Sequence, residues 1–250
     1  MKPRSRALAR AKRRLKEKDL TAPRRAENKY VAGLVSLFQG FQARCVAAIV
    51  GKTDAYGPVQ TSLDALERDI PKVAARVPLL YQMMALEVRM ANREAAIAAL
   101  GFTPGADLEI ERAILVGREA NIALVENALR DYAQSVREVF EDPTSFGLTT
   151  DELKARLLAK GGISDARAEL IARDQTLKLN GQINEARQRG AGVTEYTWST
   201  VGDDRVRDTH RAHEGKVFRW DSPPPDTGHP GQDYQCRCVG IARLEEFDGI

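Results

Sequence analysis

The sequence predicts an α+β protein, with a mainly helical N-terminal bundle and a small mixed α/β module at the C-terminal end. Apolar residues make up 43% of the 250 residues but aromatic residues only 6%, which favours helices cored by Ala, Leu, Val and Ile. Apolar positions recur at three- and four-residue spacing from about residue 28 to 140, the period of a helix with one buried face. After residue 193 short alternating stretches and Pro-rich turns replace this period, as is typical of strands.

The periodic region, residues 28–145, predicts about four helices. The first helix carries the apolar stripe Tyr30, Leu34, Phe38, Phe41, Cys45 and Ile49. Pro71 predicts a kink or two short helices, and Pro78 suits the first turn of the next helix. The longest pattern runs over 108–140. We interpret Met83, Met84 and Met90 as core residues.

Two connecting helices are expected within residues 146–192, each with a start signal. Thr149 or Thr150 can cap the first, and Ser164 or Asp165 can cap the second. Glycines follow both, as they commonly follow helix ends.

The last segment, residues 193–250, is expected to fold into three strands and one short helix. The stretch VTEYTWST alternates, which places Tyr196 and Trp198 on one face of a strand. DDRVRDTHRAHEG predicts a short helix, KVFRW a second strand and CRCVGIARL a third, with Cys236 and Cys238 on one side. Trp198, Phe218 and Trp220 are the expected core of this module.

A basic arm precedes the helices and is expected to be flexible over residues 1–27. Residues 1–25 hold eleven Lys or Arg and two acids, a net charge of +9, so the other 225 residues carry −6 of the total of +3. Such an arm could neutralise DNA phosphates or bind an acidic protein surface. A solvated arm that only aids solubility has the same composition.

Composition excludes several classes of protein. Three cysteines, Cys45, Cys236 and Cys238, form no disulfide framework and suit a reducing compartment. We find no apolar run near the roughly 18 residues of a membrane span, and no signal peptide, so we expect a cytoplasmic protein with no membrane partner. No phosphate-binding glycine motif follows a predicted strand, which leaves nucleotide-driven chemistry unsupported.

Two thiols and an imidazole form a candidate metal site. Cys236 and Cys238 on one face of a strand, opposite His210 on a turn, could form most of a tetrahedral zinc shell. His229 is the next candidate ligand and His213 the last. Alternatively, the cysteines are small buried groups, His210 is a hydrogen-bonded core residue, and the protein has no cofactor.

Catalytic interpretations use the same residues and find less support. Cys236 or Cys238 with His210 and Asp203 or Asp204 supplies the residue types of a nucleophilic site, and His210, His213 and Asp204 could hold a nuclease metal. Because the flanking sequence matches no nucleophile context, we predict that the protein is not an enzyme and assign no catalytic residue.

The C-terminal third resembles a known family. The order of an Ala-Arg helix, the WST strand, DDRVRDTHRAHEGKVF, a proline loop and a closing CRC is similar to the C-terminal domain of the phage Mu F-like minor head proteins, over roughly residues 165 to 243. The resemblance covers about a third of the chain. By this resemblance, residues 193–250 are a Mu F-like module, and residues 28–145 are a helical domain that binds portal or capsid.

The resemblance implies a minor capsid or head-morphogenesis protein of a tailed double-stranded DNA phage. Its partners would be the phage portal protein and the major capsid protein, with packaged DNA on the basic arm. It would assist head assembly, DNA packaging or ejection. It would lie in the virion, inside the capsid near the portal, and in the host cytoplasm during assembly.

A zinc-dependent nucleic-acid-binding or nuclease-like module is the alternative. Some relatives carry cysteines at the positions of Arg207 and His210, with a histidine close before the final CRC, and so resemble complete zinc sites. Here Arg207 offers no ligand, and His229 lies farther from Cys236. His210, Cys236 and Cys238 remain as the residues that could hold a metal.

Overall fold

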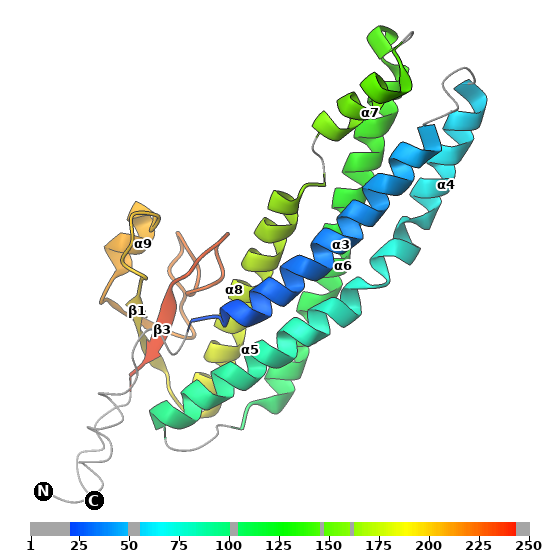
Figure 1. Cartoon of the computed structure of the whole chain (residues 1–250). Helices are drawn as coiled ribbons and strands as arrows, with labels where there is room; N and C mark the ends of the chain where they lie inside the picture. Colours follow the sequence, from blue (N-terminus) through cyan, green and yellow to red (C-terminus); the bar gives the residue numbers. More distant parts are fainter. Residues whose placement is uncertain (1–20, 50–55, 101–104, 146–147, 161–162, 244–250) are drawn as a thin grey trace, which may run out of the picture. The chain divides into compact units, whose positions relative to one another are not determined.

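The computed structural model describes residues 21–49, 56–100, 105–145, 148–160 and 163–243. The helices are α3 (Arg24–Ile49), α4 (Tyr56–Ala74), α5 (Val77–Leu100), α6 (Asp107–Glu141), η1 (Pro143–Ser145), α7 (Thr150–Ala159), α8 (Asp165–Gly190) and α9 (Asp208–His213); the strands are β1 (Glu195–Ser199), β2 (Val217–Arg219) and β3 (Val239–Ala242) (Figure 1). This confirms the predicted α+β class. Most of the basic arm lies outside the described residues, and α3 already begins at Arg24.

The chain forms two compact units. The first, here called the helical unit, comprises residues 28–82 and 118–172. The second, called the mixed unit, contains the described residues of 1–27, 83–117 and 173–250. The mixed unit therefore contains the candidate site, the sheet and the parts of α5, α6 and α8 that support them.

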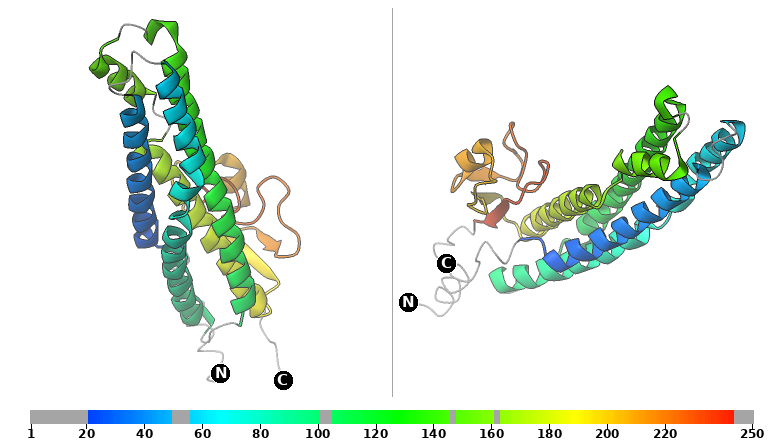
Figure 2. Two further views of the ribbon diagram at one scale, coloured as in Figure 1. Left: turned by 90° about the vertical axis from the view of Figure 1, so that its right-hand side faces the viewer. Right: turned by 45° about the horizontal axis from the view of Figure 1, so that its top comes forward.

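The helical unit is held by a buried apolar core and by ion pairs between its helices. Its helices α3 and α4 and the C-terminal part of α6 run alongside one another (Figure 2). The Tyr30 hydroxyl donates to Asn121 Oδ1 over 2.7 Å inside this core. At the surface, Arg44 of α3 pairs with Asp69 of α4 at 2.9 Å. The predicted apolar stripe of α3 is buried along its whole length, as a core helix requires.

Helix α3 corrects one expectation about membranes. Among the described residues, it is the one helix long and apolar enough to cross a membrane by length and composition. The expectation that no segment comes near this length was therefore wrong. The core helix of a bundle passes the same test, and 39% of the apolar window of α3 is buried inside the protein.

Local signals set several helix boundaries as predicted. Thr149 caps α7 in a capping box, since its hydroxyl accepts from the Glu152 backbone N–H and the Glu152 carboxylate accepts from the Thr149 N–H. Ser164 Oγ accepts from the Arg167 N–H at the start of α8. Pro71 lies inside α4, which continues to Ala74. Of the two expected outcomes at Pro71, the structure therefore excludes a division into two short helices.

The sheet of the mixed unit has three antiparallel strands in the order β2-β1-β3. Alternation in β1 buries Tyr196 and Trp198 on one face, as predicted. They form a core cluster with Trp220 and both cysteines of the CRC motif, and Phe218 packs against it. The aromatic side chains of the C-terminal module thus surround the candidate site.

Helix α8 supports the sheet through polar side chains. The side-chain amides of Asn184 and Gln188 donate to the Gly240 carbonyl at 3.0 and 2.7 Å, and Gln188 Oε1 accepts from the indole N–H of Trp220 at 3.1 Å. At Gly181 the helix passes so close to the loop between β2 and β3 that a Cβ atom would lie 2.7 Å from the Pro230 carbonyl oxygen. This close contact requires glycine.

Two sequence expectations are corrected by the fold. Cys236 and Cys238 lie in the loop before β3 rather than on the strand, because pairing with β1 begins only at Val239. Met84 is buried as predicted, but Met83 and Met90 lie on the solvent side of α5, 49% and 54% exposed. Three methionines in one helix cannot all face the core when only one side of the helix is covered.

Candidate metal centre

Two short segments bring the three predicted ligands together. His210 lies on α9, and Cys236 and Cys238 lie on the loop that leads into β3. The loop is shaped by backbone conformations with positive φ at Gly228, Gly231 and Gln235. Gln235 adopts this uncommon conformation at 53° while its backbone N–H donates to the carboxylate of Asp174 on α8, over 2.8 Å. A buried acid of the supporting helix thus anchors the loop that presents both sulfurs.

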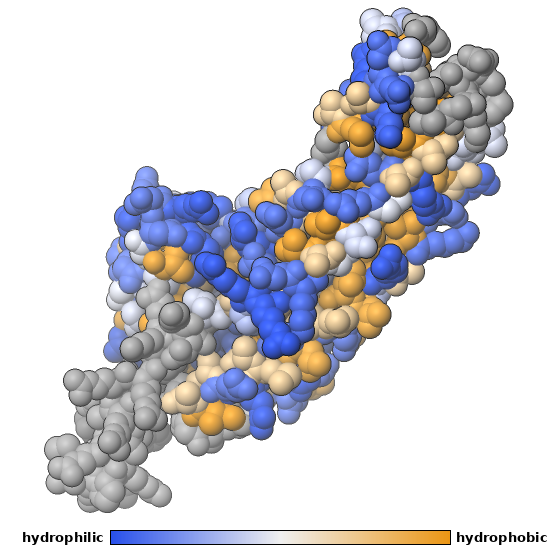
Figure 3. Space-filling model, viewed as in Figure 1, coloured by the Kyte–Doolittle hydropathy of each residue, from blue (hydrophilic) through white to orange (hydrophobic). Residues whose placement is uncertain are grey.

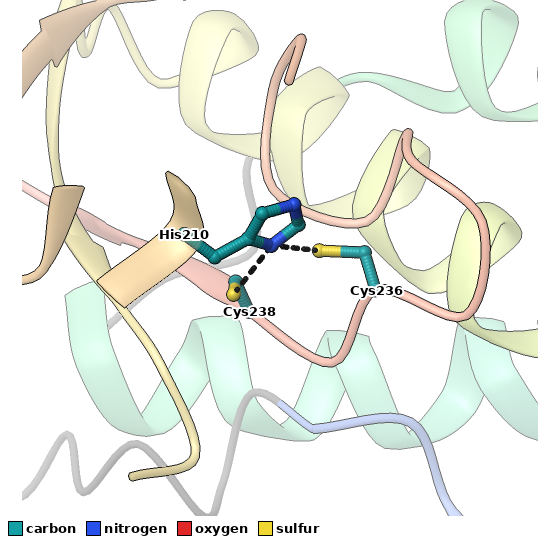
Figure 4. A group of neighbouring side chains, drawn as sticks. All are labelled: His210, Cys236 and Cys238. Atoms are coloured by element: carbon teal, nitrogen blue, oxygen red, sulfur yellow. Dashed lines mark hydrogen bonds between the residues drawn. The ribbon is translucent and has the colours of Figure 1, made fainter. Parts of the chain in front are cut away.

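The imidazole points one nitrogen at both sulfurs (Figure 4). His210 Nδ1 lies 3.4 Å from Cys238 Sγ and 3.5 Å from Cys236 Sγ. The three ligand atoms lie within 4.8 Å of one another, and all three residues are buried. The structure therefore assembles the predicted set of His210, Cys236 and Cys238.

The other imidazole nitrogen is held by an acid. His210 Nε2 lies 3.0 Å from Asp233 Oδ2. Because a carboxylate only accepts, Nε2 carries the proton and Nδ1 faces the sulfurs with its lone pair. Burial raises the pKa of Asp233, but the Tyr234 backbone N–H, His210 and Arg207 outweigh it and lower the pKa overall. The acid therefore remains ionised and orients the ring, as second-shell carboxylates do for metal-bound histidines.

The two thiols differ in how readily they lose a proton: Cys236 loses its proton easily, and Cys238 retains its own. The pKa of Cys236 is lowered to about 6, chiefly by its hydrogen bond with Cys238 and against the effect of burial, with a further contribution from the Gly231 N–H at 3.3 Å. The pKa of Cys238 is raised by the hydrogen bond with Cys236 and then by burial. One negative charge is thus well accommodated, and a second would require a cation in the site.

The Trp198 indole N–H borders this pair. It is buried and makes no hydrogen bond of normal geometry with the described residues. It nevertheless opposes the rise in the pKa of Cys238. The indole N–H therefore acts on the sulfur through its partial positive charge, without a well-aligned hydrogen bond. An indole N–H beside a sulfur favours the thiolate form, which is the form that binds metals.

The distances fit a soft divalent metal. With Zn–S near 2.3 Å and Zn–N near 2.1 Å, tetrahedral ligands place N and S about 3.6 Å apart. The two observed N–S distances, 3.4 and 3.5 Å, are close to this value. They also suit hydrogen bonds from the thiols. His210, Cys236 and Cys238 would hold zinc as three ligands, and the metal would supply a structural crosslink.

The other predicted residues lie elsewhere. Arg207 donates to the Tyr234 carbonyl at 2.7 Å and pairs with Asp233 at 3.1 Å, so it braces the loop that carries the cysteines. His229 Nδ1 lies 3.0 Å from the Tyr196 hydroxyl, in a separate aromatic contact with Trp220. His213 pairs with Asp226.

The acids considered for catalysis are not part of the cluster. Asp203 binds the guanidinium of Arg237 through two hydrogen bonds of 2.6 Å. The acid that contacts His210 is Asp233, which the sequence analysis missed. Its place three residues before Cys236, within the ligand-bearing loop, was the available signal.

In the mixed unit, the small sheet and the short helix α9 enclose the cluster of His210, Cys236 and Cys238. The long helix α8 supports this sheet. Residues 134–241 match the family model described as "Phage Mu protein F like protein". This confirms the resemblance to phage Mu F-like proteins over that region. The match begins earlier than the sequence motifs did, within α6.

One relative also matches part of the chain. An uncharacterized protein of Haemophilus influenzae (strain ATCC 51907 / DSM 11121 / KW20 / Rd) is 36% identical over 130 residues, which are 52% of this chain and 29% of that protein. The matched part is thus less than a third of that relative's length. No solved structure matches the chain.

Proposed function

We propose that this chain is a minor capsid and head-morphogenesis protein of a tailed double-stranded DNA phage. The observation that carries the proposal is the family match over residues 134–241. The partners are the portal protein and the major capsid protein, and the role is to assist head assembly, DNA packaging or ejection. The protein then resides inside the capsid near the portal, after assembly in the host cytoplasm.

A structural role for the cluster supports the proposal of a protein that is not an enzyme. The side chain of His210 is 3% exposed, and both cysteines are buried. A substrate would need to reach these atoms, whereas a crosslink works best when water is excluded from it. The buried cluster therefore favours a folded scaffold over an open catalytic site.

A zinc-dependent nucleic-acid-binding module is the second candidate, and the convergence of His210, Cys236 and Cys238 is the observation in its favour. Zinc in this site would stabilise the module in either function. If the module were a nuclease, removal of zinc would also abolish DNA cleavage. A cleavage assay on the zinc-loaded protein therefore distinguishes a nuclease from a structural head protein.

Co-assembly tests the proposed function. When the full chain is expressed with the portal and major capsid proteins of the phage that encodes it, we expect it to sediment with heads and to remain in portal-containing fractions after the capsid is dissociated. The control expresses the chain alone, where it should stay in the soluble fraction. Absence from heads and from portal fractions would refute the proposal.

Removal of residues 1–20 tests the DNA role of the arm. These residues carry nine Lys or Arg and two acids. Because phosphate contacts release counterions, we expect the deletion to weaken DNA binding at least tenfold at low salt and to flatten its salt dependence. The melting temperature should change little, since the deletion ends before α3. Equal salt dependence with and without the arm would contradict this prediction, as measured by fluorescence anisotropy.

A further inference from the structure

The indole N–H of Trp198 is a buried hydrogen-bond donor without an acceptor. The Trp198 side chain is fully buried, and its Nε1 atom makes no hydrogen bond with any residue that the structure describes. The indole N–H of Trp220, in the same core cluster, donates to Gln188 Oε1 at 3.1 Å. Because a buried donor without an acceptor is costly and uncommon, the Trp198 N–H requires an explanation.

Trp198 packs directly against the candidate metal centre. Its ring stands edge-on to that of His210, with centroids 5.6 Å apart and an interplanar angle of 89°. The strand register holds it there. The Trp198 backbone N–H donates to the Lys216 carbonyl, and on the other side Trp198 lies opposite Gly240 of β3, two residues beyond Cys238. The sheet therefore fixes the indole beside the sulfurs.

The Cys238 sulfur is the neighbouring group whose ability to accept depends on metal binding. The pKa of Cys238 is raised chiefly by its hydrogen bond with Cys236, and the Trp198 side chain opposes this rise, which identifies the two side chains as neighbours. A thiol is a weak acceptor, whereas a thiolate accepts strongly. Metal ligation requires the thiolate. The indole N–H thus lacks an acceptor beside a thiol and would gain one beside a metal-bound sulfur.

The two other ligands already have their supporting groups. The Gly231 backbone N–H donates to Cys236 Sγ at 3.3 Å, and Asp233 holds the far nitrogen of His210 at 3.0 Å. Such outer contacts orient ligands and tune their affinity for the metal. A donor to Cys238 from Trp198 would give each of the three ligands one supporting group.

His213 offers another acceptor close to the indole. Its Nδ1 is also buried without a hydrogen bond among the described residues, and its ring centroid lies 5.1 Å from that of Trp198. The two groups nevertheless do not bond to each other, since the rings are packed together and against Phe218. An acceptor from outside cannot reach a fully buried ring. In Figure 3 the surface at the place labelled α9 in Figure 1 is mainly hydrophilic, so the aromatic rings lie beneath it.

We propose that Trp198 is a positioning residue of the metal centre, and that its indole N–H donates to the Cys238 thiolate when a metal is bound. The contact stabilises the negative charge on the second sulfur and holds that sulfur toward the ion shared with His210 and Cys236. The proposal goes beyond the proposed function and rests on the candidate metal centre alone. It is tested on the full chain without any head protein, so a failure of co-assembly does not affect it.

Nuclear magnetic resonance of the reduced, ¹⁵N-labelled chain tests the contact directly, because two tryptophans give two indole N–H signals. Trp198→Phe or Trp220→Phe assigns them. When zinc is added, we expect the Trp198 indole proton to move downfield more than that of Trp220, whose hydrogen bond to Gln188 is already formed. With ¹¹³Cd in place of zinc, the Trp198 indole proton should show scalar coupling to the metal through Cys238 Sγ.

Zinc affinity, measured by competition with a chromophoric chelator, gives a second readout. Trp198→Phe keeps an aromatic ring but removes the N–H, so we expect zinc to bind about tenfold more weakly. The matched control is Trp220→Phe, which removes an indole of the same core cluster whose N–H contacts no sulfur and should leave zinc affinity unchanged. Circular dichroism confirms that each variant is folded, and the resonance measurement on the wild-type chain does not depend on them.

His213→Phe distinguishes the two acceptors, because it removes Nδ1 and keeps a ring against Trp198. The downfield movement on zinc binding should persist in this variant. An indole signal of Trp198 that zinc does not move, or a movement lost in His213→Phe, would overturn the proposal. So would the absence of coupling to ¹¹³Cd, equal zinc affinities of Trp198→Phe and Trp220→Phe, or a wild-type chain that binds neither metal.

Discussion

Zinc should raise the free energy of unfolding of the C-terminal module by about 4 kcal/mol when the free ion is a thousandfold above its dissociation constant. The reason is that His210 Nδ1 and the two sulfurs converge only in the folded module, so the metal binds the folded state in preference to the unfolded one. The measurement is urea unfolding of reduced, chelator-treated protein with and without zinc. Both tryptophans of the chain, Trp198 and Trp220, lie in the module, so tryptophan fluorescence reports its unfolding specifically.

The cysteines allow a matched comparison for this prediction. Cys236→Ser should abolish the response to zinc, because a neutral hydroxyl is a poor zinc ligand. Cys45→Ser alters the one other cysteine of the chain, which is buried in the helical unit, and should keep the full response. A wild-type protein that zinc does not stabilise would show that the cluster is held by hydrogen bonds alone.

Gln188→Leu should lower the free energy of unfolding of the module by about 3 kcal/mol. Gln188 accepts from the indole N–H of Trp220 and donates to the Gly240 carbonyl, and all three groups are buried. Leucine is of similar size but leaves the indole N–H without an acceptor and the carbonyl with one donor fewer. The loss is measured by urea unfolding followed through tryptophan fluorescence.

Gln182→Leu is the control, since Gln182 is exposed on the same helix and its replacement should change stability by no more than about 0.5 kcal/mol. Gln188→Glu gives a second test. The carboxylate can still accept from Trp220 but cannot donate to Gly240, so this variant should also be destabilised. If Gln188→Leu unfolds like the wild type, the polar contacts between α8 and the sheet contribute little to stability.

Local patterns in the sequence predicted much of the fold. The two-residue alternation in β1 put Tyr196 and Trp198 on one buried face, and the capping signal at Thr149 marked the start of α7. These predictions succeeded because side-chain direction and capping depend on neighbours within a few residues. The burial of each methionine in α5 failed as a prediction, because it depends on how many sides of the helix are covered.

The sequence by itself determined which residues could form a cluster, since His210, Cys236 and Cys238 are among the few soft ligands in the chain. Only the tertiary structure showed that one imidazole nitrogen meets both sulfurs while Asp233 holds the other. It also showed that the polar side of α8 is buried against the sheet. The physical reason is that these contacts join residues distant in the chain, and no short-range pattern records which hydrogen-bonding groups will meet once water is excluded.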